Sequence, residues 1–342
     1  MKVLEKFTVP TGEIYTAESE SGKFEFLSLG DYGKEKNIKA NFLGFDKNIN
    51  GVPHGELMPL SKKWVVTIST QPGCTMQCKF CDVWKYALVP SASVLSNEDL
   101  IKQVIYAVST HPEITHTERL NVHYARMGEP TFNINVLDAT YYLKEYFNNL
   151  KWGFHPVIST MMPKGNQKLF SFLKEWIDIK NNTCKGEAGL QLSINSTSDE
   201  FRADHFKNMS LSLKEMNTLF KDIDLTTLKG RKIALNFALD DKSIIEGKVL
   251  KNYFDPKYFM VKITPMHVTN NCIENNIVTV DGYTKYHSYE NAEASLLKEG
   301  FDTLVFIPSI EEDKGRITCG NALLSGTVPE VKYTKKILNI DL

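Results

Sequence analysis

Three cysteines, Cys74, Cys78 and Cys81, lie within eight residues of one another in the segment GCTMQCKFCD, residues 73–82. Each iron of a [4Fe–4S] cluster needs a thiolate or an equivalent ligand. Three cysteines leave one iron with an open coordination position, and an open position is what separates a catalytic metal from a structural one. The spacing Cys-x3-Cys-x2-Cys therefore indicates an iron–sulfur cluster that can bind a further ligand.

A zinc site is the main alternative. Tetrahedral zinc needs a fourth ligand, and the nearest histidines on either side of the loop are His54 and His111. The spacing of the three cysteines differs from the Cys-x2-Cys pairs that are usual in zinc sites. Three structural thiols without a metal would leave their bunching unexplained. We therefore expect a cluster, with zinc or no metal as the alternatives.

The composition is that of a soluble globular enzyme. The chain has 342 residues, of which 42% are hydrophobic and 24% charged, and its net charge is −1. There is no strongly basic field for tight non-specific binding of nucleic acid. No apolar run is long enough to span a bilayer, and the amino-terminal segment has no apolar signal-peptide region. Six cysteines, three of them bunched, do not form the pattern of a disulfide framework. We expect a cytoplasmic protein.

Strand-like and helix-like segments alternate from residue 64 onward. In segment 96–110, Ser96 can cap the first turn and Asp99 can complete a capping box. The alternation predicts a parallel sheet with crossover helices, and six such units predict an α/β fold of the partial (β/α)6 barrel type. Active-site residues are then expected at the carboxyl ends of the strands. The predicted strands are 64–70, 119–125, 155–161, 190–195, 232–239, 258–266 and 302–308. The predicted helices are 96–110, 136–149, 167–179, 212–223, 243–254 and a last one near 288–299.

This interpretation divides the chain into three parts. Residues 1–63 are rich in Gly, Lys and Asn with short apolar runs, and we expect a small β-rich extension there. Residues 64–325 hold the barrel and a carboxyl-terminal loop with Cys319. Residues 326–342 form a terminal tail of strand or loop.

At the cysteine loop the sequence resembles the radical S-adenosylmethionine (SAM) enzymes. Their signature is Cys-x3-Cys-x-aromatic-Cys, and Phe80 is the aromatic residue here. The resemblance implies that the open iron binds the amino and carboxylate groups of SAM. It also implies that an electron from the cluster cleaves SAM to give a 5′-deoxyadenosyl radical. The protein supplies position and excludes water. A partial (β/α)6 barrel is the fold of this superfamily.

The segment ARMGEP, residues 125–130, follows the second predicted strand. It resembles the Gly-Glu-Pro motif of the superfamily, whose glutamate hydrogen-bonds the SAM ammonium group. Gly128 and Glu129 would fill that role, since a carboxylate facing an ammonium forms a strong charge-assisted hydrogen bond. Gly-Glu-Pro alone is a common turn sequence, and its place after a strand gives it weight.

Further segments resemble one branch, the RNA adenosine methyltransferases of the RlmN and Cfr type. The matching segments are QPGCTMQCKFC, MGEPTFNIN, VIST (157–160), LQLSIN (190–195), SDEFR (198–202) and ITPMH (263–267). The resemblance implies SAM-binding roles for Ser159, Ser193 and Asn195, and for His267, which stands where the family has an asparagine. Otherwise these are ordinary polar residues at strand ends, which often satisfy backbone groups.

The segment DKGRITCGNAL, residues 313–323, resembles the family segment with a methyl-accepting cysteine. There the cysteine takes a methyl group from one SAM. The radical from a second SAM abstracts hydrogen from the S-methyl group, which then adds to adenine. Cys319 would be this methyl carrier, because a polarisable thiolate suits methyl capture by direct displacement. A lone cysteine is otherwise more often a small buried apolar residue.

The chain also departs from the family. Thr67 stands where the family has a second catalytic cysteine, which resolves the protein–RNA crosslink. The family's long helical RNA-recognition domain is not found in residues 1–63. Glu56 is a candidate for the family's proton-accepting glutamate, although its spacing to Pro59 differs by two residues, and an exposed glutamate is the ordinary interpretation.

Together these features predict a radical SAM enzyme with a [4Fe–4S] cluster that transfers a methyl group from SAM through Cys319 to an adenine base in RNA. A flavodoxin-type or other low-potential electron donor is implied. The alternative is a radical SAM enzyme that acts directly on a small molecule or peptide, which the missing second cysteine favours. A third option is a binding module stabilised by zinc or a cluster. The lysines that flank the cysteine loop either contact phosphates or form a solvated rim. They are Lys62, Lys63, Lys79 and Lys85.

Overall fold

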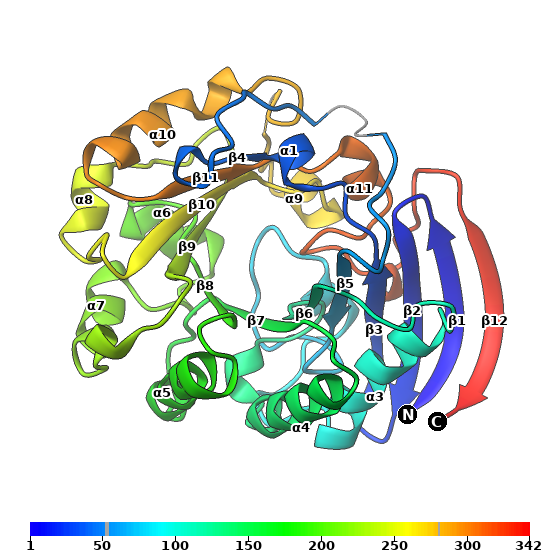
Figure 1. Ribbon diagram of the computed structural model, residues 1–342. Helices are drawn as coiled ribbons and strands as arrows, with labels where there is room; N and C mark the ends of the chain where they lie inside the picture. Colours follow the sequence, from blue (N-terminus) through cyan, green and yellow to red (C-terminus); the bar gives the residue numbers. More distant parts are fainter. Residues whose placement is uncertain (52–54, 280) are drawn as a thin grey trace.

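The computed structural model describes residues 1–51, 55–279 and 281–342, so His54 lies outside the described residues. Within them, helices surround one large mixed sheet of twelve strands (Figure 1). The predicted α/β class is confirmed. No helix in this described part of the chain combines the length and apolar character that crossing a membrane requires.

Seven neighbouring strands of the sheet run parallel and follow one another in chain order. Their bounds are β5 Trp64–Ile68, β6 Leu120–Tyr124, β7 Phe154–Thr160, β8 Gly189–Ser193, β9 Ile233–Leu239, β10 Phe259–Pro265 and β11 Thr303–Phe306. Each coincides with a predicted strand. Because all seven run the same way, their carboxyl ends meet at one edge of the sheet, where the predicted site residues follow.

Helices connect the parallel strands and lie on the outer side of the curved sheet (Figure 1). Six of them correspond to the predicted helices, but the segment predicted as helix 243–254 is helical only over five residues. In α3, the Ser96 side chain accepts a hydrogen bond from the Asp99 backbone N–H, as expected for an N-cap. The helix bounds are α1 Lys34–Asn37, α2 Val83–Tyr86, α3 Asn97–Ser109, α4 Asn135–Asn149, α5 Leu169–Asp178, α6 Asp199–His205, α7 Leu213–Lys221, α8 Gly247–Lys251, α9 Asn270–Glu274, α10 His287–Lys298 and α11 Ile310–Lys314.

Alternate side chains of the parallel strands form the main hydrophobic core. Val66 of β5, Val122 of β6 and Leu235 of β9 are fully buried, and they pack in one cluster with the apolar faces of α3, α4 and α5. The residues between them point to the inner side of the sheet and are only half-buried. This period of two is what a strand with two different faces requires.

The amino-terminal part forms antiparallel strands, as its composition indicated. Strands β1 Lys2–Val9, β2 Gly12–Ser19 and β3 Gly22–Leu29 form a meander, and β3 joins the parallel strands by pairing with β5. At the far edge of the parallel strands, the short β4 Ile38–Lys39 pairs with β11.

The carboxyl-terminal strand β12 Thr334–Asp341 returns to the amino terminus and pairs antiparallel with β1. The two ends of the chain therefore lie side by side (Figure 1), and the Leu342 backbone N–H donates to the Met1 carbonyl at 3.1 Å. Cys319 lies in the irregular segment between α11 and β12, which crosses back over the carboxyl ends of the parallel strands near β5.

Candidate active site

The cysteine loop, residues 69–82, begins directly after β5 and is fastened to the loop that follows β6. The Thr70 backbone N–H donates to the Met127 carbonyl at 2.8 Å, and the Gln71 side-chain oxygen accepts from the Glu129 backbone N–H at 3.1 Å. Neighbouring parallel strands thus bring two motifs that are some fifty residues apart into contact. Both loops lie at the carboxyl ends of the strands, as predicted.

The three cysteine thiols of this loop are free and face one another closely enough to interact electrostatically. Burial raises the pKa of Cys74 to about 12, while backbone N–H groups of Met76 and Gly128 act in the opposite direction by favouring the thiolate. Burial first, and then the neighbouring cysteines, raise the pKa of Cys78. Metal binding requires deprotonated thiols, and converging N–H groups are suited to sulfur ligands that carry negative charge.

The geometry of the loop bears on which metal it suits. Among residues 1–51, 55–279 and 281–342, no group of three or more His, Cys, Asp and Glu side chains is arranged to hold a metal ion. Thiolates on one zinc ion lie within about 4 Å of one another, since each Zn–S bond is about 2.3 Å, whereas a four-iron cluster spreads its ligands further. His111 is engaged elsewhere, because its ring nitrogens face Glu13 and Glu113. The cysteine loop therefore offers three thiol ligands, a donor type that both zinc and iron–sulfur clusters accept.

Cys319 is brought directly to the cysteine loop by its neighbour Gly320. The Asp82 backbone N–H donates to the Gly320 carbonyl at 2.8 Å. A Cβ on Gly320 would lie 3.3 Å from the Phe80 carbonyl oxygen, and Gly320 has a φ of +88°. The contact of the two loops thus requires glycine at this position. The sequence suggested a functional Cys319, and the structure places it at the end of the cysteine loop, within electrostatic reach of Cys81.

The Cys319 thiol is reachable by solvent but surrounded by protein atoms. This partial desolvation raises its pKa, while the positive charges of Lys262 and Arg126 lower it. Cys81 also interacts electrostatically with Cys319. Burial is the larger effect, so the pKa of Cys319 is raised overall, and the two cations limit that rise.

Arg126, in the ARMGEP segment, holds the Cys319 loop in place. Its guanidinium forms a buried ion pair with Glu25 of β3 at 2.6 Å and donates to the carbonyls of Arg316 at 3.1 Å and Thr318 at 3.5 Å. The other Glu25 oxygen accepts from the Leu324 backbone N–H at 2.6 Å. Strand β3, the loop after β6 and both sides of the Cys319 loop therefore share one network.

A second network joins the cysteine loop to the loop after β10. The Asp82 carboxylate accepts from the backbone N–H groups of Asn270 at 3.1 Å and Asn271 at 2.8 Å. The Asn271 side chain donates to the Cys81 carbonyl at 2.6 Å, and the Thr269 hydroxyl donates to the Phe80 carbonyl at 2.9 Å. The end of the cysteine loop is thus fixed by α9, which sequence analysis had not assigned to the site.

Gly128 and Glu129 lie against the cysteines. Gly128 has a φ of +93°, and a Cβ there would approach the Gln71 side chain to 2.7 Å. The Glu129 carboxylate is buried and accepts from the Met161 N–H at 3.0 Å and from Thr131 at 2.8 Å. Burial raises its pKa, and these hydrogen bonds oppose the shift. Its charge acts on Cys74, so it is close to the predicted cluster position.

The four predicted SAM-contacting residues lie at or just past the ends of neighbouring strands. Ser159 and Ser193 are half-buried on the inner side of β7 and β8, and the Ser159 hydroxyl donates to Gln191 at 3.4 Å. Asn195 has a φ of +60°, and its side-chain oxygen accepts from the Ala238 N–H at 3.1 Å. His267 follows β10, and its ring lies 2.9 Å from the Tyr283 hydroxyl and 3.5 Å from Asp313.

Two further sequence candidates lie in different surroundings. Phe80 packs edge-on against Phe206 at 5.6 Å between ring centres, so it supports the cysteine loop. Glu56 is exposed. The segment that carries it is tied to Asp31, which pairs with Lys63 ahead of β5. Glu56 therefore lies at the opposite end of β5 from the cysteine loop, and the structure does not bring it to Cys319.

The inner side of the parallel strands is polar, and sequence analysis did not assign its residues to the site. Thr67, His123, Gln191, Asn236 and Lys262 point inward between buried apolar neighbours. The Asn236 side-chain nitrogen donates to Gln191 at 2.6 Å, while its oxygen, like the Thr264 hydroxyl, is buried without a partner. A signal was present in the sequence, because parallel strands normally read as continuous apolar runs, and LNVHY and IALNFAL alternate instead. Buried polar atoms normally have a hydrogen-bond partner, so the Asn236 oxygen and the Thr264 hydroxyl can each accept or donate one more hydrogen bond on this inner face.

Comparisons with known proteins agree with these features over part of the chain. No family model matches the chain, and no solved structure matches it. A probable dual-specificity RNA methyltransferase RlmN of Bacteroides fragilis is 27% identical over 201 residues, covering 57% of this chain and 52% of that protein. The RlmN of Campylobacter curvus is 36% identical over 129 residues, covering 37% of this chain and 33% of that protein. A probable dual-specificity RNA methyltransferase RlmN 1 of Protochlamydia amoebophila is 24% identical over 254 residues, covering 73% of this chain and 64% of that protein.

The chain spans about half the length of the first of these relatives. The similarity recurs in relatives from several bacteria, all of which are named as RNA methyltransferases. Over the parts that align, this chain is therefore similar to the RlmN-type methyltransferases.

Proposed function

We propose that this chain is a radical SAM enzyme that transfers a methyl group through Cys319 to an adenine base in RNA, and that β5–β10 with their helices form a partial (β/α)6 barrel. The observation that supports this best is the contact between the two loops. The Asp82–Gly320 hydrogen bond joins the loop after β5, which carries three free thiols, to the carboxyl-terminal segment, which carries a fourth at Cys319. The relatives' names, which describe RNA methyltransferases, support the proposed methyl transfer to RNA.

In this proposal Cys74, Cys78 and Cys81 hold a [4Fe–4S] cluster, and Glu129 with Ser159, Ser193, Asn195 and His267 binds SAM. When bound, the cluster and SAM supply a 5′-deoxyadenosyl radical and a transferable methyl group. The buried Glu129 carboxylate already accepts hydrogen bonds from Thr131, Met161 and Thr160, so its part in binding SAM is proposed from its charge and its place beside Cys74. The polar inner face of the strands gives the rest of the ligand hydrogen-bonding partners.

Cys319 is the nucleophile. Its thiolate sulfur takes the methyl group from SAM, so that one S–C bond forms while the methyl–sulfonium bond breaks and S-adenosylhomocysteine leaves. Arg126 and Lys262 favour the thiolate by charge. Arg126 also fixes the loop through the carbonyls of residues 316 and 318. Glu56 has no role in this scheme, because it lies at the other end of β5.

The RNA substrate is proposed from the relatives' names, and the electron donor from the cluster. A low-potential reductant such as a flavodoxin would reduce the cluster, and free thiols suit the reducing environment of the cytoplasm. The family's second cysteine corresponds to Thr67, which lies on the inner side of β5 and cannot form a disulfide. Release of a covalent RNA adduct would therefore use a different group or an external thiol.

The test begins with the chain reconstituted with iron and sulfide under anaerobic conditions. With dithionite and SAM, the loaded protein should form 5′-deoxyadenosine. Mass spectrometry should find about 14 Da added to the peptide with Cys319, as expected for one methyl group on a thiolate. Total RNA incubated with methyl-labelled SAM should then carry label on adenine.

Two variants serve as controls. Cys319→Ser should abolish the added mass and the labelled RNA while 5′-deoxyadenosine formation remains. Cys184→Ser removes a buried thiol from the segment just before β8, at the amino-terminal end of that strand, and should change neither the added mass nor the labelled RNA. A protein that binds iron but forms no 5′-deoxyadenosine would disprove the radical SAM assignment.

A second candidate function is supported by Thr67 and the polar interior. Here the radical acts directly on a small molecule or peptide within the barrel, without methyl transfer. An unmodified Cys319 after incubation with SAM, together with rapid 5′-deoxyadenosine formation, would establish this alternative over the first.

A further inference from the structure

The end of the sheet opposite the cysteine loop gathers positive side chains on its inner face. Lys63 precedes β5, Arg119 precedes β6 and Arg231 precedes β9, while Lys262 points inward from the middle of β10. Parallel strands bring their amino-terminal ends to one edge, so the topology places Lys63, Arg119 and Arg231 at the same end of the sheet, while Lys262 lies further along the inner face, where its charge also reaches Cys319. We call Lys63, Arg119, Arg231 and Lys262 the cationic ring.

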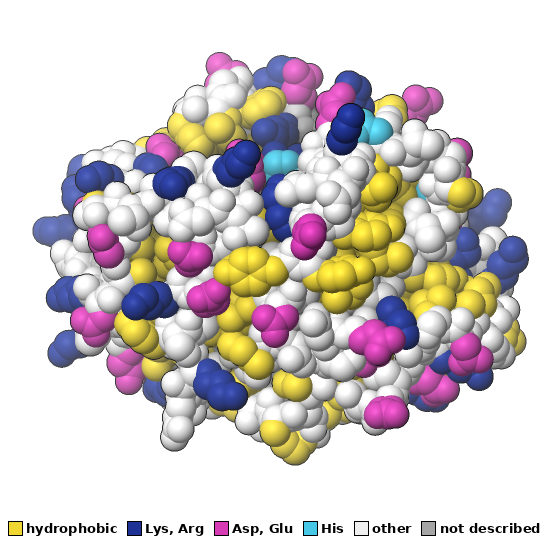
Figure 2. Space-filling view, turned by 60° about the horizontal axis from the view of Figure 1, so that its bottom comes forward, with side chains coloured by type: hydrophobic (Ala, Val, Ile, Leu, Met, Phe, Trp, Pro, Cys, Tyr) yellow, Lys and Arg dark blue, Asp and Glu magenta, His cyan; other side chains and the backbone are white. Residues whose placement is uncertain are grey.

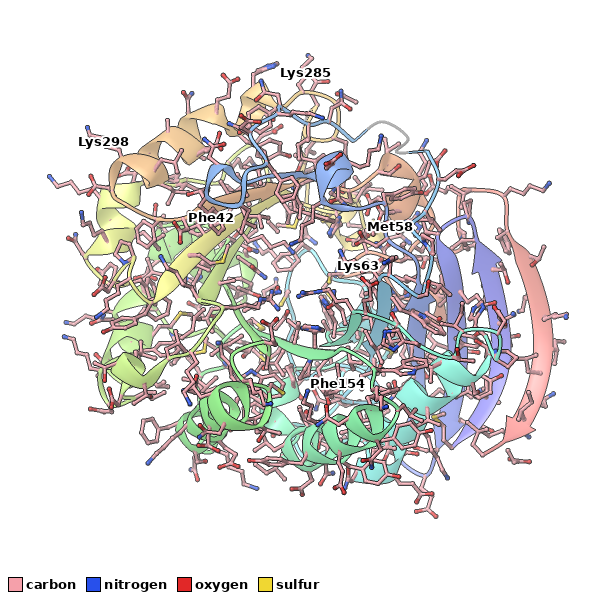
Figure 3. The ribbon with its side chains drawn as sticks, viewed as in Figure 1. Phe42, Met58, Lys63, Phe154, Lys285 and Lys298 are labelled. Atoms are coloured by element: carbon pink, nitrogen blue, oxygen red, sulfur yellow. The ribbon has the colours of Figure 1, made fainter. Side chains whose placement is uncertain are left out.

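Hydrogen bonds and contacts place the ring residues on the inner face. Arg119 lies two residues before the inward-pointing Asn121 and donates to its side chain at 3.1 Å. Arg231 folds over β8, where its guanidinium lies 3.4 Å from the position of a Cβ on Gly189. The Trp64 backbone N–H donates to the Arg119 carbonyl at 2.9 Å, which sets Lys63 beside Arg119. Figure 3 shows Lys63 on the inner side of the sheet, and Figure 2 shows that Lys and Arg side chains are interspersed with Asp and Glu over the rest of the visible surface.

The ring has more positive charge than its surroundings neutralise. Lys63 pairs with Asp31 at 2.7 Å, and Glu187 lies 3.2 Å from His155. Across the described ranges, no carboxylate lies within 4.0 Å of Arg119, Arg231 or Lys262, although Glu187 and Asp31 act on Arg119 from further away. Lys34 also interacts with Lys63, Arg119 and Arg231, and Glu312 with Lys63. Five cations against three carboxylates leave an excess of two positive charges in a partly desolvated space.

This crowding destabilises the charged forms. Burial lowers the pKa of Lys262, and the charges of Arg231 and Lys63 lower it further. Burial and Arg119 likewise lower the pKa of Arg231. Repulsion among clustered cations lowers the stability of the fold. Functional sites commonly carry such a loss of stability, because the clustered charges serve binding or catalysis.

We propose that the cationic ring is a binding site for a phosphate-type polyanion, the phosphate or pyrophosphate group of a small molecule that enters the interior from the amino-terminal side. Two guanidinium groups offer forked donors that match phosphate oxygens, and the two lysines add point charges. Three of the ring residues face the interior from the end remote from the cysteine loop, and Lys262 lies between them and Cys319, so the ring suits a small ligand rather than a polymer on the surface. This inference does not depend on the proposed function.

Inorganic pyrophosphate is the probe, used with the unmodified full chain and no cluster. Isothermal titration calorimetry should detect saturable binding. Arg119→Gln and Arg231→Gln should each weaken it by about tenfold to hundredfold, because each removes charge-assisted hydrogen bonds. Lys221→Gln, which removes an exposed charge on α7, should leave the affinity unchanged. Titration with adenosine diphosphate in parallel tells whether the anion binds more tightly when it is carried on a nucleotide.

The melting temperature gives a second measurement. A misfolded variant would melt at a lower temperature, whereas the proposal predicts a higher one. Without ligand, Arg231→Gln should raise the melting temperature, because it removes repulsion among the ring residues. Pyrophosphate should raise the melting temperature of the unmodified chain and have less effect on this variant. Absence of binding, or equal loss of affinity in the ring variants and in Lys221→Gln, would overturn the proposal.

Discussion

The ion pair of Arg126 and Glu25 shows how much one residue can carry. Both side chains are almost fully buried, and their remaining hydrogen bonds go to the loop that carries Cys319. Arg126→Leu leaves the Glu25 charge buried and unpaired, and we expect a loss of about 3–5 kcal/mol in unfolding free energy, measured by urea denaturation.

The matched control is an exposed ion pair. Lys62 and Glu118 pair on the surface with more than half of each side chain exposed. Lys62→Ala should therefore cost less than about 1 kcal/mol. Equal losses in the two variants would show that the buried pair does not organise the loop.

His123 makes stability depend on pH. Burial, together with the charges of Lys262 and Arg231, lowers its pKa to about 3 in the folded chain. The unfolded chain binds this proton near the ordinary pKa of about 6.5, so the unfolded state is favoured as the pH falls from about 6.5 toward 3. In urea unfolding at pH 7 and pH 5, His123→Gln should lose less stability between the two than the unmodified chain. His116→Gln, at an exposed position, should behave like the unmodified chain.

For individual residues, the sequence predicted which residues belong to the site better than it predicted which residues they contact. The cysteine spacing and the Gly-Glu-Pro motif are local patterns, and the structure places both at the strand ends. Arg126 lay inside a quoted motif without an assigned role, because its partners are Glu25 and the backbone near residue 317, far away in the chain. Such pairings depend on the tertiary fold, which local spacing does not encode.

Among the structural elements, the loop after β6 depends on one glycine. Gly128→Ala would combine an unfavourable positive φ with a contact of 2.7 Å to Gln71, which in turn holds the backbone at Glu129. We expect the variant to bind much less iron on reconstitution, measured as iron per chain, because the cysteine loop is displaced. Gly165→Ala has a similar φ of +75° but open space around it, and should bind iron normally.

The edge strand β12 contributes little to the core. All of its residues except Leu338 are exposed, and Ile337 is 73% exposed. Ending the chain after Tyr333 should lower the melting temperature by only about 1–3 °C. It would also bare the edge of β1, and exposed strand edges promote self-association, which light scattering would detect. A melting temperature lower by tens of degrees would show instead that β12 is integral to the fold.

The predicted elements were accurate where the apolar pattern is long. The seven parallel strands and the helices α3, α4, α5, α7 and α10 match their predicted segments closely. Short helices inside the loops, such as α9, leave too weak a periodic signal. The segment 243–254 is apolar enough for a helix, but only Gly247–Lys251 is helical. The residues just before it bond instead to the loop after β8, through Ile244 and Glu246.

For the molecule as a whole, a net charge of −1 conceals an uneven distribution. Acidic residues lie mostly outside, while the inner face of the sheet carries an excess of cations and polar groups. An average over the chain cannot reveal such an arrangement, since it depends on which strand face each residue occupies. The net charge therefore suggested that the protein has no binding site for anions, whereas the arrangement of the strands gathers cations on one inner face.

The meeting of the two chain ends has a practical consequence. The Leu342 N–H and the Met1 carbonyl are already hydrogen-bonded at 3.1 Å, so a short glycine linker can turn the backbone into a ring. Reopening that ring between the exposed Pro112 and Glu113 should give a circular permutant with native circular dichroism. In it Thr334–Asp341 and Lys2–Val9 become a covalent hairpin, and fusion partners can be attached far from the cysteine loop.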